Sequence, residues 1–272
     1  MSMIGTSFAR ARARFRKARR LPAGVRLSYA VDPIVQRAPL PFAARAARAL
    51  DLDPRQVTRF FNEAREGWIS QHIIDSGGHD ASGTTGLVAG AFLYALVRAH
   101  RPEIAVETGV ANGMSSAFML AALEANEAGR LISIDLPFTG DAAAGEPVPL
   151  VAGTTIDRAM WSPVEKGRNP GWLVPAQLRE RWDLRIGDAR DLLPRCLDET
   201  GDIGLFYHDS LHTPEYMLFE FRTAWRHLMP GGLLATDDIM RKENDAIMRF
   251  STEVGRKYVV FSDKAMIRKR SL

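Results

Sequence analysis

Between residues 104 and 236 the chain alternates short β-branched, apolar runs with longer helical runs, and this alternation constrains the fold more than any other feature. Strands that alternate with helices at this spacing predict parallel β-α-β units with right-handed crossovers. Five strands are expected, at 104–108, 131–135, 182–186, 203–208 and 233–236. Two further runs, 258–261 and 265–267, flank a tight turn and predict an antiparallel pair. We therefore expect an α/β fold with a doubly wound, mostly parallel seven-stranded sheet.

The segments outside the strands divide the chain into two parts. Apolar residues recur at three- and four-residue spacing from Pro39 to Gln71, which predicts amphipathic helices before the sheet. A linker rich in Gly and Ser follows at 76–83, and the next helix, 85–100, stops before Pro102. The prediction is a basic tail with an N-terminal helical extension over 1–83 and a sheet domain over 84–272, with helices at 115–128, 189–197 and 214–228.

One connection is much longer than the others. Residues 136–174 separate the second strand from the next element, whereas loops in compact domains usually have only a few residues. Long loops of this kind are commonly lids or substrate-binding elements, and a disordered insert is the alternative. Trp161 and Trp172 favour a lid-like insertion, because disordered segments contain few aromatic residues.

The net charge of +4 comes from a tail and not from the body of the chain. Eight basic residues precede the first acid, Asp32, so the remainder has 28 basic against 32 acidic residues, or −4. This distribution, without interleaved aromatic residues, argues against a nucleic-acid partner and favours a solvated basic arm. No apolar run approaches the roughly 18 residues of a membrane span. The single cysteine, Cys196, and the lack of an apolar secretion segment fit a cytoplasmic location.

A turn rich in small residues follows the first strand, in the sequence Glu107-Thr108-Gly109-Val110-Ala111-Asn112-Gly113-Met114-Ser115-Ser116. Gly109, Ala111 and Gly113 let the backbone approach a ligand closely, and the following helix N-terminus offers free N–H groups to an anion. The spacing G-x-x-x-G does not match the dinucleotide fingerprint G-x-G-x-x-G. A tight turn without a ligand is the alternative.

Acidic residues end the next two strands. Asp135 ends the second strand, where a carboxylate accepts hydrogen bonds from both hydroxyls of a ribose. Asp188 follows the third strand, where an acid can accept from the exocyclic amine of adenine. Either residue taken alone is more often a helix cap. Together with the small-residue turn, they predict a nucleoside site at the topological switch point of the sheet.

These segments, with His208-Asp209, Pro230-Gly231-Gly232 and Asp237-Asp238, resemble a class I S-adenosylmethionine-dependent methyltransferase over residues 84–270. Within that class the chain is similar to the bacterial macrocin-type and, more distantly, the catechol-type O-methyltransferases, which implies the Rossmann-like methyltransferase fold. The resemblance implies that the methionine part of S-adenosyl-L-methionine faces Glu107, Gly109, Ala111 and Gly113, and that its carboxylate faces Ser115. It implies Asp135 for the ribose, Asp188 and Ala189 for the adenine, and Asp209 at the same rim. Asn112 and Met114 depart from the family pattern.

Three acids follow the fourth and fifth strands. Asp209, Asp237 and Asp238 are expected to converge, because neighbouring parallel strand ends lie only about 5 Å apart. A hard divalent cation with oxygen ligands relieves such a concentration of negative charge. The resemblance implies Mg²⁺ or a similar ion at these positions. The alternative is that Asp238 caps a helix and Asp209 faces solvent.

Histidines supply the candidate general bases. His212 stands three residues after Asp209, where the catechol-type enzymes place a base, usually lysine, beside the accepting hydroxyl. Its unperturbed pKa near 6.5 suits proton abstraction from an acidified hydroxyl, with a helix-cap or supporting role as the alternative. His208 is expected to pack against the sheet, while the sequence does not orient His72 and His79.

Together these features predict metal-assisted O-methylation of a small-molecule hydroxyl, on a sugar, polyketide or phenolic acceptor. Asp209 and His212 are its catalytic candidates. Four alternatives stay open: a metal-independent methyltransferase, a non-haem iron hydroxylase, a nicotinamide-dependent oxidoreductase, and a ligand-binding module without catalysis. The adjacency of His208 and Asp209 disfavours the facial triad of the hydroxylase, and the missing fingerprint disfavours the oxidoreductase. A homo-oligomer is compatible with early helices that exchange between subunits.

Overall fold

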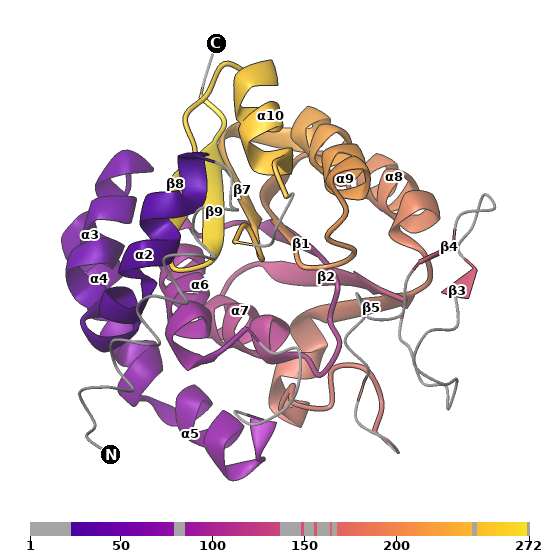
Figure 1. Cartoon of the computed structure of the whole chain (residues 1–272). Helices are drawn as coiled ribbons and strands as arrows, with labels where there is room; N and C mark the ends of the chain where they lie inside the picture. Colours follow the sequence, from indigo (N-terminus) through magenta and orange to yellow (C-terminus); the bar gives the residue numbers. More distant parts are fainter. Residues whose placement is uncertain are drawn as a thin grey trace, which may run out of the picture.

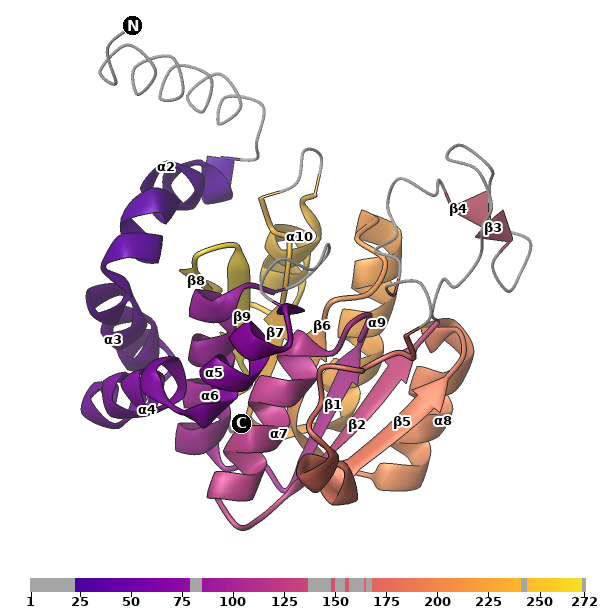
Figure 2. The same cartoon turned by 90° about the horizontal axis from the view of Figure 1, so that it is seen from below.

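A seven-stranded sheet forms the centre of the molecule (Figures 1 and 2). The computed structural model describes residues 23–78, 85–136, 148–149, 155–156, 164, 168–240 and 244–270. The strand order is β5-β2-β1-β6-β7-β9-β8, and all neighbours from β5 to β7 pair in parallel. The strands are β1 (Ile104–Thr108), β2 (Arg130–Asp135), β5 (Trp182–Ile186), β6 (Ile203–His208), β7 (Leu228–Thr236), β8 (Val259–Phe261) and β9 (Lys264–Arg268). This confirms the predicted doubly wound, Rossmann-like fold.

Helices cover both faces of the sheet (Figure 2). Helices α6 (Leu87–His100) and α7 (Met114–Ala125) pack on one face, where Ala105, Leu131 and Leu205 point into the core. Helices α8 (Ala189–Thr200), α9 (Pro214–His227) and α10 (Ala246–Glu253) pack on the opposite face against Val106 and Ile132. The odd and even residues of β1 and β2 therefore face different helix layers, as expected for strands buried on both sides.

The N-terminal extension is helical and packs on the first of these faces. It contains α2 (Ala23–Arg37), α3 (Pro39–Ala49), α4 (Pro54–Glu66) and α5 (Trp68–Asp75). Asp53 caps α4 by accepting a hydrogen bond from the Arg55 N–H at 2.8 Å. Helix α4 lies along α6, where the Tyr94 hydroxyl donates to the Glu63 carboxylate. The buried faces of α3 and α4 continue the core of the sheet domain.

Several elements differ from the sequence-based expectations. Helix α2 was not expected, because its sequence reads as a basic tail with an internal Pro33. The eight-residue α10 and the 3₁₀ helix Ala176–Arg181 are too short for a clear periodic pattern. Strand β7 starts five residues earlier than predicted, because Leu228 already pairs with Ile203 across a register shift.

The structure also describes strands in the long connection and the order of the C-terminal strand pair. In the insertion, β3 (Val148–Pro149) and β4 (Thr155–Ile156) pair in antiparallel fashion, while Trp161 and, in the linker, His79 lie outside the described residues. The C-terminal pair is inserted so that β9 lies between β7 and β8. Among the described helices, none is long and apolar enough to cross a membrane.

Candidate functional site

The carboxyl ends of β1 and β6 meet at Gly109. Its N–H donates to the carbonyl oxygen of Ile134 at 2.8 Å, and its φ of +84° is in the left-handed region. A Cβ at this position would lie 2.1 Å from the carbonyl oxygen of Asp209. Only glycine fits this close approach without a shift of the backbone. The small-residue turn is thus in direct contact with the backbone of Asp209.

Glu107 lies behind this turn and is fully buried. Its carboxylate accepts hydrogen bonds from the hydroxyls of Ser115 at 2.5 Å, Ser116 at 2.6 Å and Ser133 at 2.8 Å. Burial raises the pKa of Glu107 to about 7, although the three hydroxyls act in the opposite direction. The structure therefore brings Glu107 and Ser115 together, and the hydroxyl expected at the methionine carboxylate has an internal acceptor.

Asp135 and Asp188 each use one carboxylate oxygen within the protein. Asp135 Oδ1 accepts from the Val110 N–H at 3.0 Å. Asp188 Oδ1 caps α8 through the Arg190 N–H at 2.8 Å and accepts from the Tyr216 hydroxyl at 2.7 Å, with Ala189 as the first helical residue. The Oδ2 atoms of both residues are buried and lack a hydrogen-bond partner among the described residues.

Such oxygens are suited to external donors. A buried carboxylate oxygen without a partner is costly, and a ligand hydroxyl or amine would satisfy it. Burial also raises the pKa of Asp135, with the N–H groups of Val110 and Ala111 acting in the opposite direction. The capping role of Asp188 and its predicted ligand role are therefore compatible, because each involves a different oxygen.

The end of the insertion contacts the small-residue turn, a feature that the sequence did not reveal. The Gly171 N–H donates to the Ala111 carbonyl at 2.9 Å, and the Leu173 N–H donates to the Asn112 carbonyl at 3.0 Å. The Trp172 indole N–H donates to Asn112 Oδ1 at 2.8 Å. Asn112, which departs from the family pattern, thus accepts a hydrogen bond from Trp172 in this chain. In the sequence, only the presence of tryptophan in the insertion indicated that this segment packs against the rest of the chain.

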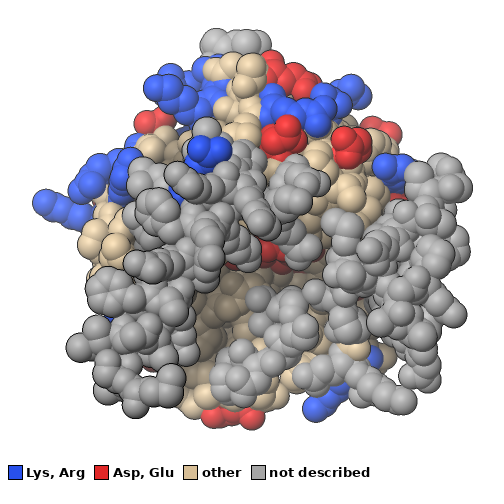
Figure 3. Space-filling view, in the orientation of Figure 1, with Lys and Arg blue, Asp and Glu red and all other residues tan. Residues whose placement is uncertain are grey.

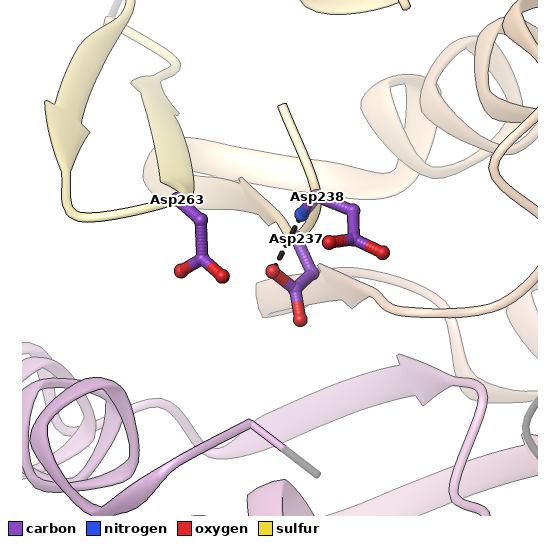
Figure 4. Close-up of side chains that lie close together, drawn as sticks. All are labelled: Asp237, Asp238 and Asp263. Carbon is purple, nitrogen blue, oxygen red and sulfur yellow. Dashed lines mark hydrogen bonds between the residues drawn. The ribbon is translucent and has the colours of Figure 1, made fainter. Parts of the chain in front are cut away.

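Four carboxylates gather at the ends of β6, β7 and the β8–β9 turn. We call Asp209, Asp237, Asp238 and Asp263 the acid corner. The ligand oxygens of Asp237, Asp238 and Asp263 lie within 4.8 Å of one another, and Figure 4 shows these carboxylates around a common space. In Figure 3 a small group of acidic side chains is visible near the centre of the face, and further acidic side chains lie toward its edges together with Lys and Arg. Asp263 was not among the predicted site residues.

One lysine lies within the acid corner. Lys264 is 1% exposed, and its Nζ lies 2.5 Å from Asp237 Oδ1 and 2.8 Å from Asp263 Oδ1. These carboxylates hold the pKa of Lys264 above its ordinary value against the effect of burial. Burial raises the pKa of Asp209 well above its ordinary value, and the negative charge of Asp237 adds to this effect. Among the described residues, Lys264 is thus a cation held between Asp237 and Asp263 of the acid corner.

The predicted catalytic pair lies at the same place. His212 is 6% exposed, and its Nε2 is 3.7 Å from both Asp209 Oδ1 and Asp238 Oδ2. Asp238 has a left-handed φ of +53° and does not cap α10, which begins at Ala246. Asp209, Asp237, Asp238 and His212 therefore lie together at this edge of the sheet, and their roles stay a prediction.

The other histidines have separate partners. His208 is fully buried in β6, as expected, and its Nδ1 donates to Glu220 at 2.6 Å. His72 donates from Nε2 to the Leu173 carbonyl at 3.0 Å, so α5 contacts the segment that binds the small-residue turn. Neither residue contacts the acid corner through a side-chain hydrogen bond described here.

Comparisons with known proteins point to one family. A family model described as "Methyltransferase domain" matches residues 106–239, and no curated protein matches the chain. Rv0187 from MTB, solved with cofactor bound, has 16% identity and a TM-score of 0.52, over 79% of this chain and 97% of that chain.

Two further solved structures are similar in fold. The SAH-bound methyltransferase PaMTH1 from Podospora anserina has 13% identity and a TM-score of 0.50, over 75% of this chain and 88% of its own. The O-methyltransferase TomG from Streptomyces achromogenes, in complex with SAM, has 17% identity and a TM-score of 0.50, over 75% and 89%. The family match over residues 106–239 and the sheet topology together support an S-adenosylmethionine-dependent methyltransferase domain on a Rossmann-like methyltransferase fold.

Proposed function

We propose that this methyltransferase transfers the methyl group of S-adenosyl-L-methionine to a hydroxyl of a small molecule. The observation that supports this most is the placement of His212 beside Asp209 and Asp238, next to the turn that contacts Gly109. The proposed cofactor-side and acceptor-side groups thus lie at one edge of the sheet. Among the similar structures, TomG is described as an O-methyltransferase involved in tomaymycin synthesis. Sugar, polyketide and phenolic hydroxyls all remain in the proposed acceptor class.

On the cofactor side, two carboxylates are proposed to recognise the nucleoside. The free Oδ2 of Asp135 would accept from the ribose hydroxyls, and the free Oδ2 of Asp188 would accept from the adenine amine. The N-terminus of α7, with Gly113 before it, offers N–H groups to the methionine carboxylate. Ser115 would add its hydroxyl only if it shared it with Glu107, to which it already donates.

On the acceptor side, His212 is proposed as the general base. The acceptor oxygen forms a bond to the methyl carbon as the carbon–sulfur bond breaks, and the electron pair of that bond stays on sulfur as a neutral thioether. The hydroxyl proton moves to His212 Nε2. Asp209 and Asp238, each 3.7 Å from this nitrogen, would stabilise the imidazolium that forms. The protein thus supplies alignment and charge stabilisation.

We further propose that Mg²⁺ assists this step. Asp209, Asp237 and Asp238 are the predicted ligands, and Asp263 is a further candidate because the carboxylate oxygens of Asp237, Asp238 and Asp263 lie within 4.8 Å of one another. Carboxylate oxygens are ligands that Mg²⁺ prefers, and four carboxyl groups lie at this edge of the sheet. A bound ion would lower the pKa of the acceptor hydroxyl and orient two vicinal oxygens. The metal-independent alternative has support from Lys264, a cation already paired with Asp237.

The test combines binding and turnover with matched variants. Calorimetry should show S-adenosylhomocysteine binding in preference to NAD, and mass spectrometry should show an acceptor gaining one methyl group. His212→Ala should lower kcat by about 10²- to 10⁴-fold without weakening S-adenosylhomocysteine binding. His227→Ala, on the remote end of α9, is the control and should be unchanged. Binding of NAD alone would overturn the proposal, and full turnover with a chelator present would overturn only its metal part.

A further inference from the structure

Among the described residues that contact the acid corner, Lys264 is the one lysine, and it is buried. The register of β9 against β7 sets its position. Thr236 of β7 pairs with Ala265 of the antiparallel β9. The residue that follows Thr236, Asp237, therefore comes to lie beside the residue that precedes Ala265, Lys264. Their side-chain atoms are 2.5 Å apart, and Asp263 accepts from the same Nζ at 2.8 Å. The contact is thus set by backbone pairing and not by a flexible surface chain.

The N-terminal extension also fixes this lysine. The turn between β8 and β9 contains Ser262, which is 5% exposed and has a φ of +56°. Its hydroxyl donates to Asp32 Oδ1 of α2 at 2.6 Å, and Gln36 of α2 donates to the Ser262 hydroxyl at 2.9 Å. Helix α2 therefore holds the turn from which Asp263 and Lys264 project toward Asp237.

The charge balance shows what this lysine can do. An ammonium that is 1% exposed has lost nearly all contact with water, so its charge is stabilised by the carboxylates around it. It occupies Asp237 Oδ1, one of the oxygens that a cation at this place would use. A divalent ion near the same carboxylates would also be repelled by the ammonium, and this repulsion is strong where little water intervenes.

We propose that Lys264 is a resident counter-ion that weakens the affinity of the acid corner for a divalent cation and positions Asp237 for the acceptor side. This inference rests on the metal part of the proposed function. A chain without this lysine would hold Mg²⁺ tightly, whereas this chain binds it weakly and reversibly. Lys264 acts through Asp237 and Asp263, so it is a positioning residue and not a catalytic one.

The experiment measures metal binding in the full chain saturated with S-adenosylhomocysteine. Lys264→Gln keeps amide donors for Asp237 but removes the charge, and Lys264→Arg keeps the charge. Calorimetric titration with MgCl2 at constant ionic strength should give a dissociation constant about ten-fold or more lower for Lys264→Gln than for the unmodified chain. Lys264→Arg should differ by less than about two-fold. Lys257→Gln removes a lysine from an exposed position and should leave the constant unchanged.

Equal or weaker Mg²⁺ binding by Lys264→Gln would overturn the inference while leaving the methyl transfer untouched. Absence of Mg²⁺ binding by both proteins would overturn it together with the metal part, and the methylated product would then decide the rest of the proposed function separately. Thermal denaturation in MgCl2 tests the inference by a second measurement if Lys264→Gln folds poorly. The melting temperature of Lys264→Gln should rise more with MgCl2 than that of the unmodified chain. A variant that stays unfolded in MgCl2 also contradicts the inference, because Mg²⁺ should replace the lost charge.

Discussion

The contact between Trp172 and Asn112 gives a sharp test of how the insertion supports the small-residue turn, where we propose that the cofactor binds. Trp172→Phe removes the indole N–H that donates to Asn112 Oδ1 at 2.8 Å. It keeps an aromatic ring beside the Arg168 guanidinium, which lies 4.6 Å from the ring centroid in the present structure. The change is therefore confined mainly to one hydrogen bond, and the expected effect is on the position of the turn between Gly109 and Gly113.

The magnitude follows from the number of bonds that remain. A hydrogen bond of this kind contributes about 0.5–1.5 kcal/mol, which corresponds to about 2- to 13-fold in a binding constant. The Gly171 and Leu173 N–H groups still donate to the carbonyls of Ala111 and Asn112. These two bonds retain part of the turn geometry, so we expect S-adenosylhomocysteine to bind about 2- to 10-fold more weakly, with kcat changed less than KM.

A double-mutant cycle with Asn112→Ala separates this effect from general destabilisation. If the two side chains act through one bond, the double variant should bind S-adenosylhomocysteine no more weakly than the weaker single variant. Trp225→Phe, on the opposite helix layer, is the matched control and should leave binding unchanged. Strict additivity of the two substitutions, within about 0.3–0.5 kcal/mol, would refute the reasoning.

Two further predictions concern the buried residues beneath the turn. Burial raises the pKa of Glu107 to about 7. Between about pH 4.5 and 7 the folded chain therefore binds more protons than the unfolded chain. The free energy of unfolding should fall by about 3 kcal/mol as pH rises through this window. Urea unfolding at several pH values should show that Glu107→Gln lacks this component, and an unchanged slope would contradict it. Gly109→Ala should destabilise the fold by about 2 kcal/mol or more, because its Cβ would collide with the Asp209 carbonyl. Gly255→Ala, at a φ of +62° with open space around it, should lose only about 1 kcal/mol in the same assay.

The sheet was predictable because its strands carry their own signals. Runs such as Ile104–Thr108 and Ile203–His208 are apolar, β-branched and bounded by turns, and their observed bounds equal the predicted ones. Helix α2 escaped prediction because it follows a run of basic residues and contains Pro33, although its Val35 is buried. Short elements such as α10 depend on tertiary packing, here of Phe250 against Phe221, and not on local propensity.

The candidate site was predictable to the extent that strand ends define it. Parallel strands bring Asp135, Asp209 and Asp237 to one edge whatever the loops do. Lys264 was not predictable in the same way, because its position beside Asp237 depends on the register of β9 against β7 and on β9 lying inside the sheet. Sequence proximity gives no sign of a pair separated by 27 positions. Trp172 and Asn112, 60 positions apart, show the same limit.

The N-terminal extension connects the two sides of this site, which bears on where acceptor choice is encoded. Helix α2 holds the β8–β9 turn through Asp32 and Ser262, on the side of the acid corner. Helix α5 contacts Leu173 through His72, on the side of the small-residue turn. Side chains of one extension therefore support both the cation pair at Asp237 and the segment that binds Asn112. Because loops and added helices vary more readily than the strand ends they surround, we expect the extension and the insertion to be the places that encode the choice of acceptor.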